Sequence, residues 1–140
     1  MVTIRTILHP TDFSERSGYA FELACSLARD LGARLIVLHV VHTSLAVEKR
    51  SFGEDLAEDL NRMKVPNLTP PVERRLKEGD PATEICRVAK ETGCEMIAMG
   101  THGRTGIGRL LMGSVVEQVV RKAPCPVLAV KAPFAKLDSC

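Results

Sequence analysis

The sequence carries little net charge and no long apolar run, and both absences exclude classes of function. Its 19 basic and 17 acidic residues give a formal net charge of only +2, scattered along the chain. Proteins that bind nucleic acid or anionic membranes need a concentrated basic surface. No apolar run reaches the roughly 18 residues of a membrane span, and residues 1–7 do not resemble a signal peptide. We therefore expect a cytoplasmic protein without nucleic-acid or membrane partners.

The cysteines lack the spacing of a metal site or a disulfide framework. Cys25, Cys86, Cys94, Cys125 and Cys140 form an odd set with no C-x-x-C pair, and no histidines lie at zinc-finger spacing. We interpret the first four as ordinary buried or half-buried thiols and Cys140 as the most exposed. No metal site is expected, and a thiol redox sensor stays open as one alternative function.

The chain is long enough for one core. At 140 residues, a single domain buries about two-thirds of its unfolded surface. We place this domain at residues 1–133 and a short C-terminal tail at 134–140. Apolar runs predict strands at 3–9, 35–41, 96–99 and 126–130, with a polar strand at 72–76 that suits a sheet edge.

Helical spacing of apolar residues predicts four helices between these strands. They span about 19–31, 43–64, 81–92 and 114–123. Gly32 ends the first, while Asp80 supplies an N-cap before Pro81 in the third. Strands alternating with helices indicate an α/β protein with an open five-stranded parallel sheet in three layers. Such sheets bind ligands at the carboxyl ends of strands, where the winding direction reverses.

A glycine-rich segment follows the predicted strand 96–99. Residues 100–109 contain four glycines and two arginines. Successive main-chain amides in such a turn form a concavity that suits phosphate. Ser114 begins an S-x-x-E sequence typical of a capping box, so we expect it to open a helix that points at this loop. The alternative is a flexible connection with Ser114 as a simple cap; the Walker and G-x-G-x-x-G signatures are absent.

The glycines also have the spacing of a known family. Gly100, Gly103 and the pair Gly113-Ser114 fit G-x2-G-x9-G-S/T, the pattern of the ATP-binding branch of the universal stress protein family. Residues 7–14 (ILHPTDFS), 38–41 (LHVV) and 124–130 (PCPVLAV) also resemble that family, so the likeness spans essentially the whole chain. The resemblance implies strand order 3-2-1-4-5 in a Rossmann-like, adenine nucleotide alpha hydrolase-like fold. It also implies a stress-response regulator or sensor that binds ATP, ADP or AMP, with or without Mg²⁺.

The resemblance further implies roles for individual residues. Asp12 would accept hydrogen bonds from the ribose hydroxyls, since a carboxylate suits a diol. Pro10 and Thr11 would shape the adenine side, and the main chain of Val40 would contact the base. Met99 and Gly100 would lie beneath the nucleotide, and the phosphates would contact Gly103, Arg104, Gly113, Ser114, Val115 and Val116. Many ATP-binding relatives have a hydroxyl residue where this chain has Val116, which would weaken triphosphate binding.

Several of these residues also have purely structural interpretations. Asp12 could serve only to cap the first helix, and His102 could bind phosphate or simply face solvent. Arg104 could be a solvated charge, although it is the better phosphate candidate of the two loop arginines. His9 and His39 lie within strand runs, so we interpret both as core or ladder histidines rather than catalysts.

The loop supplies no base and no carboxylate pair for a metal, which favours a binding protein with at most slow hydrolysis. The alternative is an ATP-hydrolysing or adenylating enzyme on the same fold, but residues 10–14 lack the S-G-G-x-D-S-like loop of such enzymes. The apolar strand within 126–131 falls at a sheet edge by topology, and an uncovered edge invites pairing with a second copy. We therefore expect a homodimer through this strand.

Overall fold

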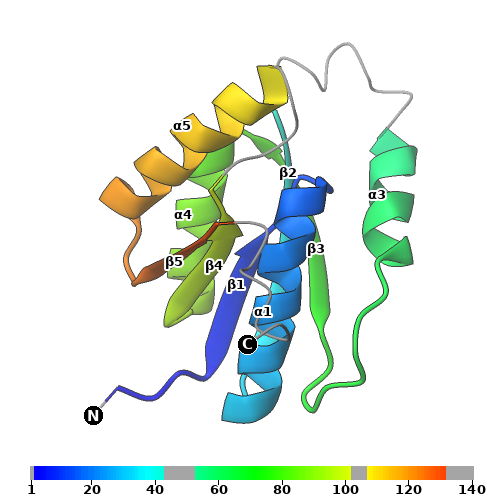
Figure 1. Cartoon of the computed structure of the whole chain (residues 1–140), viewed down its shortest axis with the longest axis vertical. Coiled ribbons are helices and arrows are strands. Elements are labelled where there is room, and N and C mark those ends of the chain that lie inside the picture. Colours follow the sequence, from blue (N-terminus) through cyan, green and yellow to red (C-terminus); the bar gives the residue numbers. More distant parts are fainter. Residues whose placement is uncertain (1, 43–52, 102–106, 132–140) are drawn as a thin grey trace, which may run out of the picture.

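The computed structural model of the chain describes residues 2–42, 53–101 and 107–131, and it is an alternating α/β protein (Figure 1). The five strands form one parallel sheet in the order β3-β2-β1-β4-β5, as predicted. The elements in chain order are β1 (Thr6–Pro10), α1 (Glu15–Leu31), β2 (Arg34–His42), α3 (Gly53–Arg62), β3 (Glu73–Gly79), α4 (Pro81–Thr92), β4 (Met96–Gly100), α5 (Ile107–Lys122) and β5 (Val127–Val130).

Helices cover both faces of the sheet, which gives the three predicted layers (Figure 1). Side chains alternate across the central strands, so Leu8, Ile36 and Leu38 pack with α4 and α5. Ile7 and Leu35 point the other way, into the cluster that includes residues of α1 and α3. All five are 0% exposed, which explains why β1 and β2 are almost continuously apolar.

The helix ends follow local sequence signals. The side chain of Asp80 accepts a hydrogen bond from the amide of Thr83, and Pro81 occupies the first turn of α4, as predicted. Gly32 and Gly93 end α1 and α4 in the left-handed conformation at φ 64°, where a side chain would be strained. These caps fix where the chain leaves each helix for the next strand.

Two predicted boundaries are wrong. Helix α5 begins at Ile107, not at Ser114, so Ser114 lies inside the helix and does not open it with a capping box. The residues between, Arg109, Leu110, Leu111 and Met112, are all good helix formers, and this propensity outweighs the glycines at 108 and 113. The first strand starts at Thr6 because the amides of Arg5 and Thr6 donate to Glu95 Oε1, at 3.0 and 2.8 Å.

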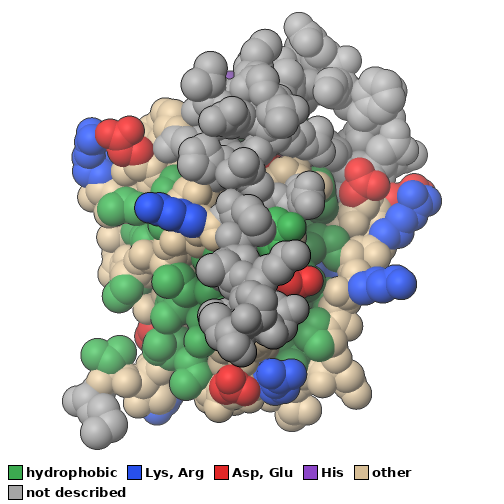
Figure 2. All heavy atoms as spheres, in the orientation of Figure 1, with side chains coloured by type: hydrophobic (Ala, Val, Ile, Leu, Met, Phe, Trp, Pro, Cys, Tyr) green, Lys and Arg blue, Asp and Glu red, His purple; other side chains and the backbone are tan. Residues whose placement is uncertain are grey.

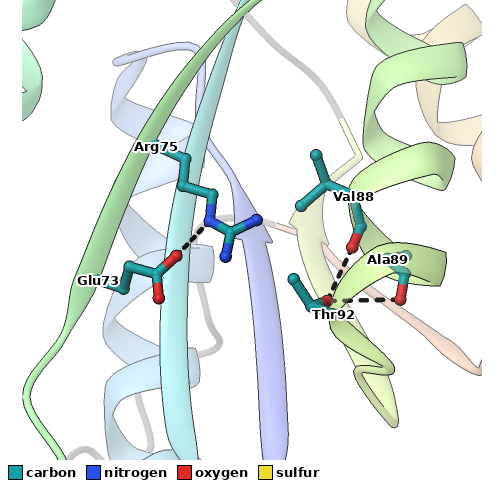
Figure 3. Close-up of polar contacts among 5 residues, drawn as sticks. All are labelled: Glu73, Arg75, Val88, Ala89 and Thr92. Atoms are coloured by element: carbon teal, nitrogen blue, oxygen red, sulfur yellow. Dashed lines mark hydrogen bonds and ion pairs between the residues drawn. The ribbon is translucent and has the colours of Figure 1, made fainter.

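The edge strand β3 differs from the buried strands in its side chains. Its residues are half-buried or exposed, and Glu73 forms an ion pair with Arg75 along the strand (Figure 3). Polar side chains on an edge strand oppose pairing with other chains. The helix predicted over 43–64 is confirmed at Gly53–Arg62, while its predicted beginning lies outside the described residues.

Candidate functional site

The carboxyl ends of β1, β2 and β4 meet at one edge of the sheet, where the winding reverses. The chain passes from β1 to β2 and β3 on one side, then crosses to β4 on the other. A parallel sheet opens a crevice for ligands at this point. The residues that follow β1, from Thr11 to Ser14, therefore lie at the same edge of the sheet as the end of β4 at Gly100.

Pro10 ends the pairing between β1 and β4. The last pair is Leu8 with Ile97, and Pro10 has no N–H to donate to the next carbonyl of β4. The buried His9 takes its place, since its Nδ1 lies 2.8 Å from the carbonyl oxygen of Ala98. Because a carbonyl only accepts, Nδ1 carries the proton. This hydrogen bond satisfies the carbonyl at the point where the pairing of β1 with β4 ends.

His9 is a core histidine, as its place in a strand predicted. It is 0% exposed, and burial lowers its pKa from 6.5 to about 4 against the opposing effects of its bond to Ala98 and the charge of Asp12. The ring is therefore neutral at pH 7, with its Nε2 buried and without a partner. Its ring centroid lies 5.6 Å from that of Phe21 in α1.

Thr11 joins the end of β1 to both β2 and α1. Its amide donates to the carbonyl of Leu38 at 2.8 Å, which extends the sheet by one residue. Its hydroxyl oxygen accepts from the amide of Phe13 at 3.1 Å and from the hydroxyl of Ser17 at 2.8 Å. Thr11 and Ser17 are both buried, so these bonds hold the turn from inside.

Asp12 is half-buried at the tip of this turn. Its Oδ1 accepts from the amide of Ser14 at 2.9 Å, and Ser14 rather than Asp12 is the N-cap of α1. The alternative in which Asp12 only caps the first helix is therefore wrong. Between them Phe13 has φ 63°, a left-handed conformation uncommon for a residue with a side chain. Such strain persists only where the surroundings enforce it, and it clusters at functional sites.

His39 of β2 contacts the same turn through a hydrogen bond and a ring contact. Its Nδ1 donates to the carbonyl oxygen of Thr11 across 2.7 Å. Its ring lies against that of Phe13, with centroids 4.5 Å apart and a tilt of 43°. His39 thus holds both the main chain before Asp12 and the strained residue after it.

The structure places the other predicted residues of this half as follows. Pro10 is buried, and Val40 is half-buried near the end of β2, where it packs against the cluster beneath α4 and α5. The side chain of Met99 is 0% exposed in that cluster, so only its main chain can face a ligand. Gly100 is buried at the end of β4, and the amide of Thr101 donates to the carbonyl of Val130.

The phosphate half is only partly described. His102, Gly103 and Arg104 lie outside the described residues, while Gly113 falls within helix α5. Ser114 is exposed on α5, where its hydroxyl accepts from the side chain of Gln118 at 3.2 Å.

The side chains of Val115 and Val116 pack into the core. They are 9% and 8% exposed and belong to the core cluster of α4, α5 and the sheet. The phosphate contacts expected of both residues, and the effect expected of Val116 on triphosphate binding, stay predictions.

Sequence reasoning missed the residues that hold Asp12 in place. Ser14, Ser17, Phe13 and His39 form the turn together with Thr11. Ser14 could have been found from the sequence, because serine is a preferred N-cap residue. Its hydroxyl accepts from the amide three residues later, which is that of Ser17. The bond from His39 had no signal in the sequence, because it joins residues 28 positions apart through sheet pairing.

Other candidate chemistry is sparse in the part of the chain that the structure describes. There, no group of three or more His, Cys, Asp or Glu side chains is placed to hold a metal ion. Within the same residues, none of the helices has both the length and the apolar character needed to cross a membrane. Cys25, Cys86, Cys94 and Cys125 are free thiols, buried or half-buried as predicted.

This strand order defines a Rossmann-like α/β protein, and the structured turn at the winding reversal is its candidate site. The model of the universal stress protein family matches residues 3–131, and the chain belongs to that family. Universal stress protein MJ0531 of Methanocaldococcus jannaschii is 34% identical over 141 residues, covering 92% of this chain and 83% of that protein.

Solved structures agree with this assignment. The structure of MJ0577, also from M. jannaschii, has a TM-score of 0.72 and is 31% identical in sequence. The match covers 96% of this chain and 100% of the MJ0577 chain. The structure of UspA from Lactobacillus plantarum has a TM-score of 0.80 and is 26% identical in sequence. The match covers 93% of this chain and 99% of the UspA chain.

Two more distant structures share the fold. One is a universal stress protein in complex with cAMP, with a TM-score of 0.66 and 22% identity over 94% of this chain and 100% of its own. The other, from Archaeoglobus fulgidus, is in complex with dAMP, with a TM-score of 0.59 and 20% identity over 94% and 100%.

Proposed function

We propose that this protein binds an adenine nucleotide, ATP foremost, at the carboxyl ends of β1, β2 and β4, and acts in the stress response as a nucleotide-binding regulator. The observation that carries the proposal is the fixed position of Asp12. Its Oδ1 accepts from the amide of Ser14, which orients the carboxylate at the tip of a turn held by buried bonds. A carboxylate held at this place suits the ribose hydroxyls, which would donate to it.

The adenine would lie between the ends of β1 and β2. Pro10 and Thr11 form one wall, and the main chain of Val40 offers donor and acceptor groups to the edge of the base. Gly100 would let the nucleotide approach the end of β4 closely, since it has no side chain. Main-chain contacts of this kind suit a flat heteroaromatic base.

The phosphates would extend toward the glycine-rich segment. His102, Gly103, Arg104 and Gly113 supply amides and a cation there by sequence, and the exposed hydroxyl of Ser114 adds one group from α5. The proposed contacts are thus strongest for the adenosine half, where the described residues make a supported turn.

We also propose the cytoplasm as the location and residues 1–133 as one domain.

The family supports the ligand class. The universal stress proteins solved with cAMP and dAMP carry adenine nucleotides on this fold. Their identity to this chain is only 22% and 20%, so they support the fold as a scaffold for such ligands, and the choice of residues rests on the turn at Asp12.

The test is calorimetric titration of the purified protein with ATP, ADP, AMP and adenosine, with and without Mg²⁺. We expect dissociation constants below about 1 mM for at least one nucleotide, equivalent to about 4 kcal/mol of binding free energy. If adenosine and all three nucleotides bind more weakly than this, the proposal fails. Because we propose at most slow hydrolysis, we do not expect many turnovers of ATP per minute in the presence of Mg²⁺.

Matched aspartate variants assign the ribose contact. Asp12→Asn keeps an oxygen for the amide of Ser14 but removes the charge, so we expect at least tenfold weaker binding with an unchanged melting temperature. Asp30→Ala removes an exposed carboxylate paired with its neighbour Arg29 and should bind like the parent. Equal affinities for the two variants would contradict the role of Asp12.

We further propose that the protein forms a homodimer through the edge of β5. The carbonyls of Pro126 and Val130 accept from β4, so the main chain of Ala129 between them points away from the sheet. Val120 of α5 is 57% exposed, and apolar side chains gather over the β4 and β5 side of the face drawn in Figure 2. An apolar strand edge with an apolar surround favours pairing with a like surface.

Ala129→Pro tests this dimer. Proline removes the N–H on the open side of β5 and leaves the bonds to β4 in place. Sedimentation at micromolar concentration should show a dimer for the parent and for Ala129→Val, which keeps the N–H, but a monomer for Ala129→Pro. A monomeric parent at high micromolar concentration would overturn the proposal.

A further inference from the structure

Two thiols lie in contact at the end of the sheet opposite the proposed nucleotide site. Cys94 lies two residues before β4 and Cys125 two residues before β5, and their Sγ atoms are 3.8 Å apart. Cys94 is 5% exposed and belongs to the core cluster beneath α4 and α5, while Cys125 is half-buried and packs against it. The carboxyl end of β4 leads to the proposed phosphate segment.

The backbone on both sides of this pair is fixed. Thr92 ends α4 by donating from its hydroxyl to the carbonyls of Val88 and Ala89, at 2.8 and 3.4 Å (Figure 3). After the left-handed Gly93, the amide of Cys94 also donates to Ala89, at 3.3 Å.

Cys125 is held in a similar way by the residues beside it. The amide of Ala123 bonds to Val119, and the carbonyl of Pro126 accepts from Ile97 of β4. The sulfurs are therefore presented to each other by anchored main chain, and a disulfide requires them to close from 3.8 Å to about 2.0 Å.

We propose that Cys94 and Cys125 are a redox modification site that forms an intramolecular disulfide on oxidation by a peroxide. Hydrogen peroxide oxidises the Cys125 thiolate to a sulfenic acid, with cleavage of the O–O bond and release of water after proton transfer. The Cys94 sulfur then attacks the Cys125 sulfur, the S–S bond forms, and the S–O bond breaks with loss of a second water. Two thiols and one peroxide thus give one disulfide and two waters, with the peroxide reduced by two electrons.

The surroundings assign the order of the two sulfurs. Cys125 is the more exposed, so it meets peroxide first. Burial raises the pKa of both thiols, that of Cys94 to about 12. Either sulfur can donate in this contact; donation from the S–H of Cys94 lowers the pKa of Cys125 and so favours its thiolate, against the effect of burial. Both groups remain largely protonated at neutral pH, so the reaction is slow there and accelerates as the pH rises.

The disulfide would close a covalent ring of residues 94–125. That ring contains β4, the glycine-rich segment and α5, which is the part of the chain proposed to carry the phosphate contacts. Closing a loop of this length restricts the unfolded chain, so the oxidised protein should melt at a higher temperature than the reduced one. The proposal itself does not depend on nucleotide binding.

The test uses the full chain carrying Cys140→Ser, which removes the thiol of the C-terminal tail. Peroxide treatment followed by thiol counting in denaturant should show the loss of two of the four remaining thiols, restored by dithiothreitol. Peptide mass spectrometry should identify a Cys94–Cys125 linkage. A linkage of Cys86 to Cys125, or over-oxidation with Cys94 still alkylatable, would overturn the assignment.

Serine variants supply the matched controls. Cys94→Ser and Cys125→Ser should each abolish both the loss of two thiols and the rise in melting temperature. Cys86→Ser and Cys25→Ser should keep both, although Cys86 lies close enough to Cys125 for the two to interact electrostatically. If a serine variant does not fold, the linkage map of the Cys140→Ser protein alone decides the question.

Discussion

The imidazole of His39 and the carbonyl of Thr11 are joined by a hydrogen bond of 2.7 Å, which links β2 to the turn after β1. This bond places a side chain of the second strand directly under the turn that presents Asp12. It ties the proposed base-binding strand to the proposed ribose-binding turn. Disturbing it should therefore affect both stability and ligand binding.

We predict that His39→Ala lowers the free energy of unfolding by about 1 kcal/mol or more, since a buried acceptor and a ring contact lose their partner. Nucleotide affinity should fall in parallel because the turn loosens. His39→Asn keeps a donor near the position of Nδ1 and should recover much of the affinity. Denaturant unfolding and calorimetry measure the two quantities, and identical affinities for the parent and His39→Ala would exclude a positioning role.

A second prediction concerns acid and His9. Its pKa is lowered from 6.5 in the unfolded chain to about 4 in the fold, so the unfolded state binds the proton first as the pH falls. The stability contributed by neutral His9 is complete above about pH 6.5 and is lost as the pH drops toward 4. The loss should approach about 1.4 kcal/mol per pH unit within this window.

The matched variant is His9→Asn, which keeps a donor for Ala98 but does not titrate. Urea unfolding of both proteins at intervals from pH 7 to pH 4 gives the two slopes, and the difference between them isolates His9 from the carboxylates. Parallel slopes would show that His9 has an ordinary pKa in the fold.

A third prediction contrasts two glycines. Gly79 has φ 151°, and a Cβ there would meet Glu84 Cγ at 2.8 Å. Glu84 is 8% exposed and paired with Arg87, so it has little room to move. We expect Gly79→Ala to cost about 1–3 kcal/mol of stability.

Gly18→Ala is the control for this change. Gly18 lies within α1 with open space where a methyl group would stand, so alanine should stabilise the helix by about 0.5–1 kcal/mol. Thermal melts of both variants measure the effects. If the two variants shift the melting temperature in the same direction, the conformational argument for Gly79 is wrong.

A fourth prediction concerns the cap of α4. Asp80 accepts from the amide and the hydroxyl of Thr83, and these bonds hold its pKa below the usual 3.8. Asp80→Ala should cost about 1 kcal/mol at pH 7. Because the folded pKa is lowered, the benefit of Asp80 is present above the unfolded value and is lost as the pH falls through the folded one.

Asp80→Asn should retain most of the stability at pH 7, since asparagine is also a good N-cap. Its stability should also be less sensitive to acid than that of the parent. Chemical unfolding at pH 7 and pH 3 compares the three proteins, and a full loss on Asp80→Asn at pH 7 would indicate that charge rather than capping stabilises this end.

Local and periodic features were predictable because they depend on residues close together in the chain. The cap at Asp80, the stop at Gly93 and the buried runs of β1, β2 and β4 all follow from neighbouring residues. The start of α5 was not predictable from the serine at 114, since a capping-box sequence also occurs inside a helix whose preceding residues favour helix. Propensity over a full turn outweighed one apparent cap.

The sequence by itself determined the alternation of strands and helices, the parallel sheet and the family, because period and glycine spacing are properties of the chain order. Only the tertiary structure decided which residues hold Asp12, that Val115 and Val116 pack inward, and that Cys94 meets Cys125. These contacts join residues far apart in the chain. They exist only after the sheet has set its register, which brings the ends of separate strands to one edge.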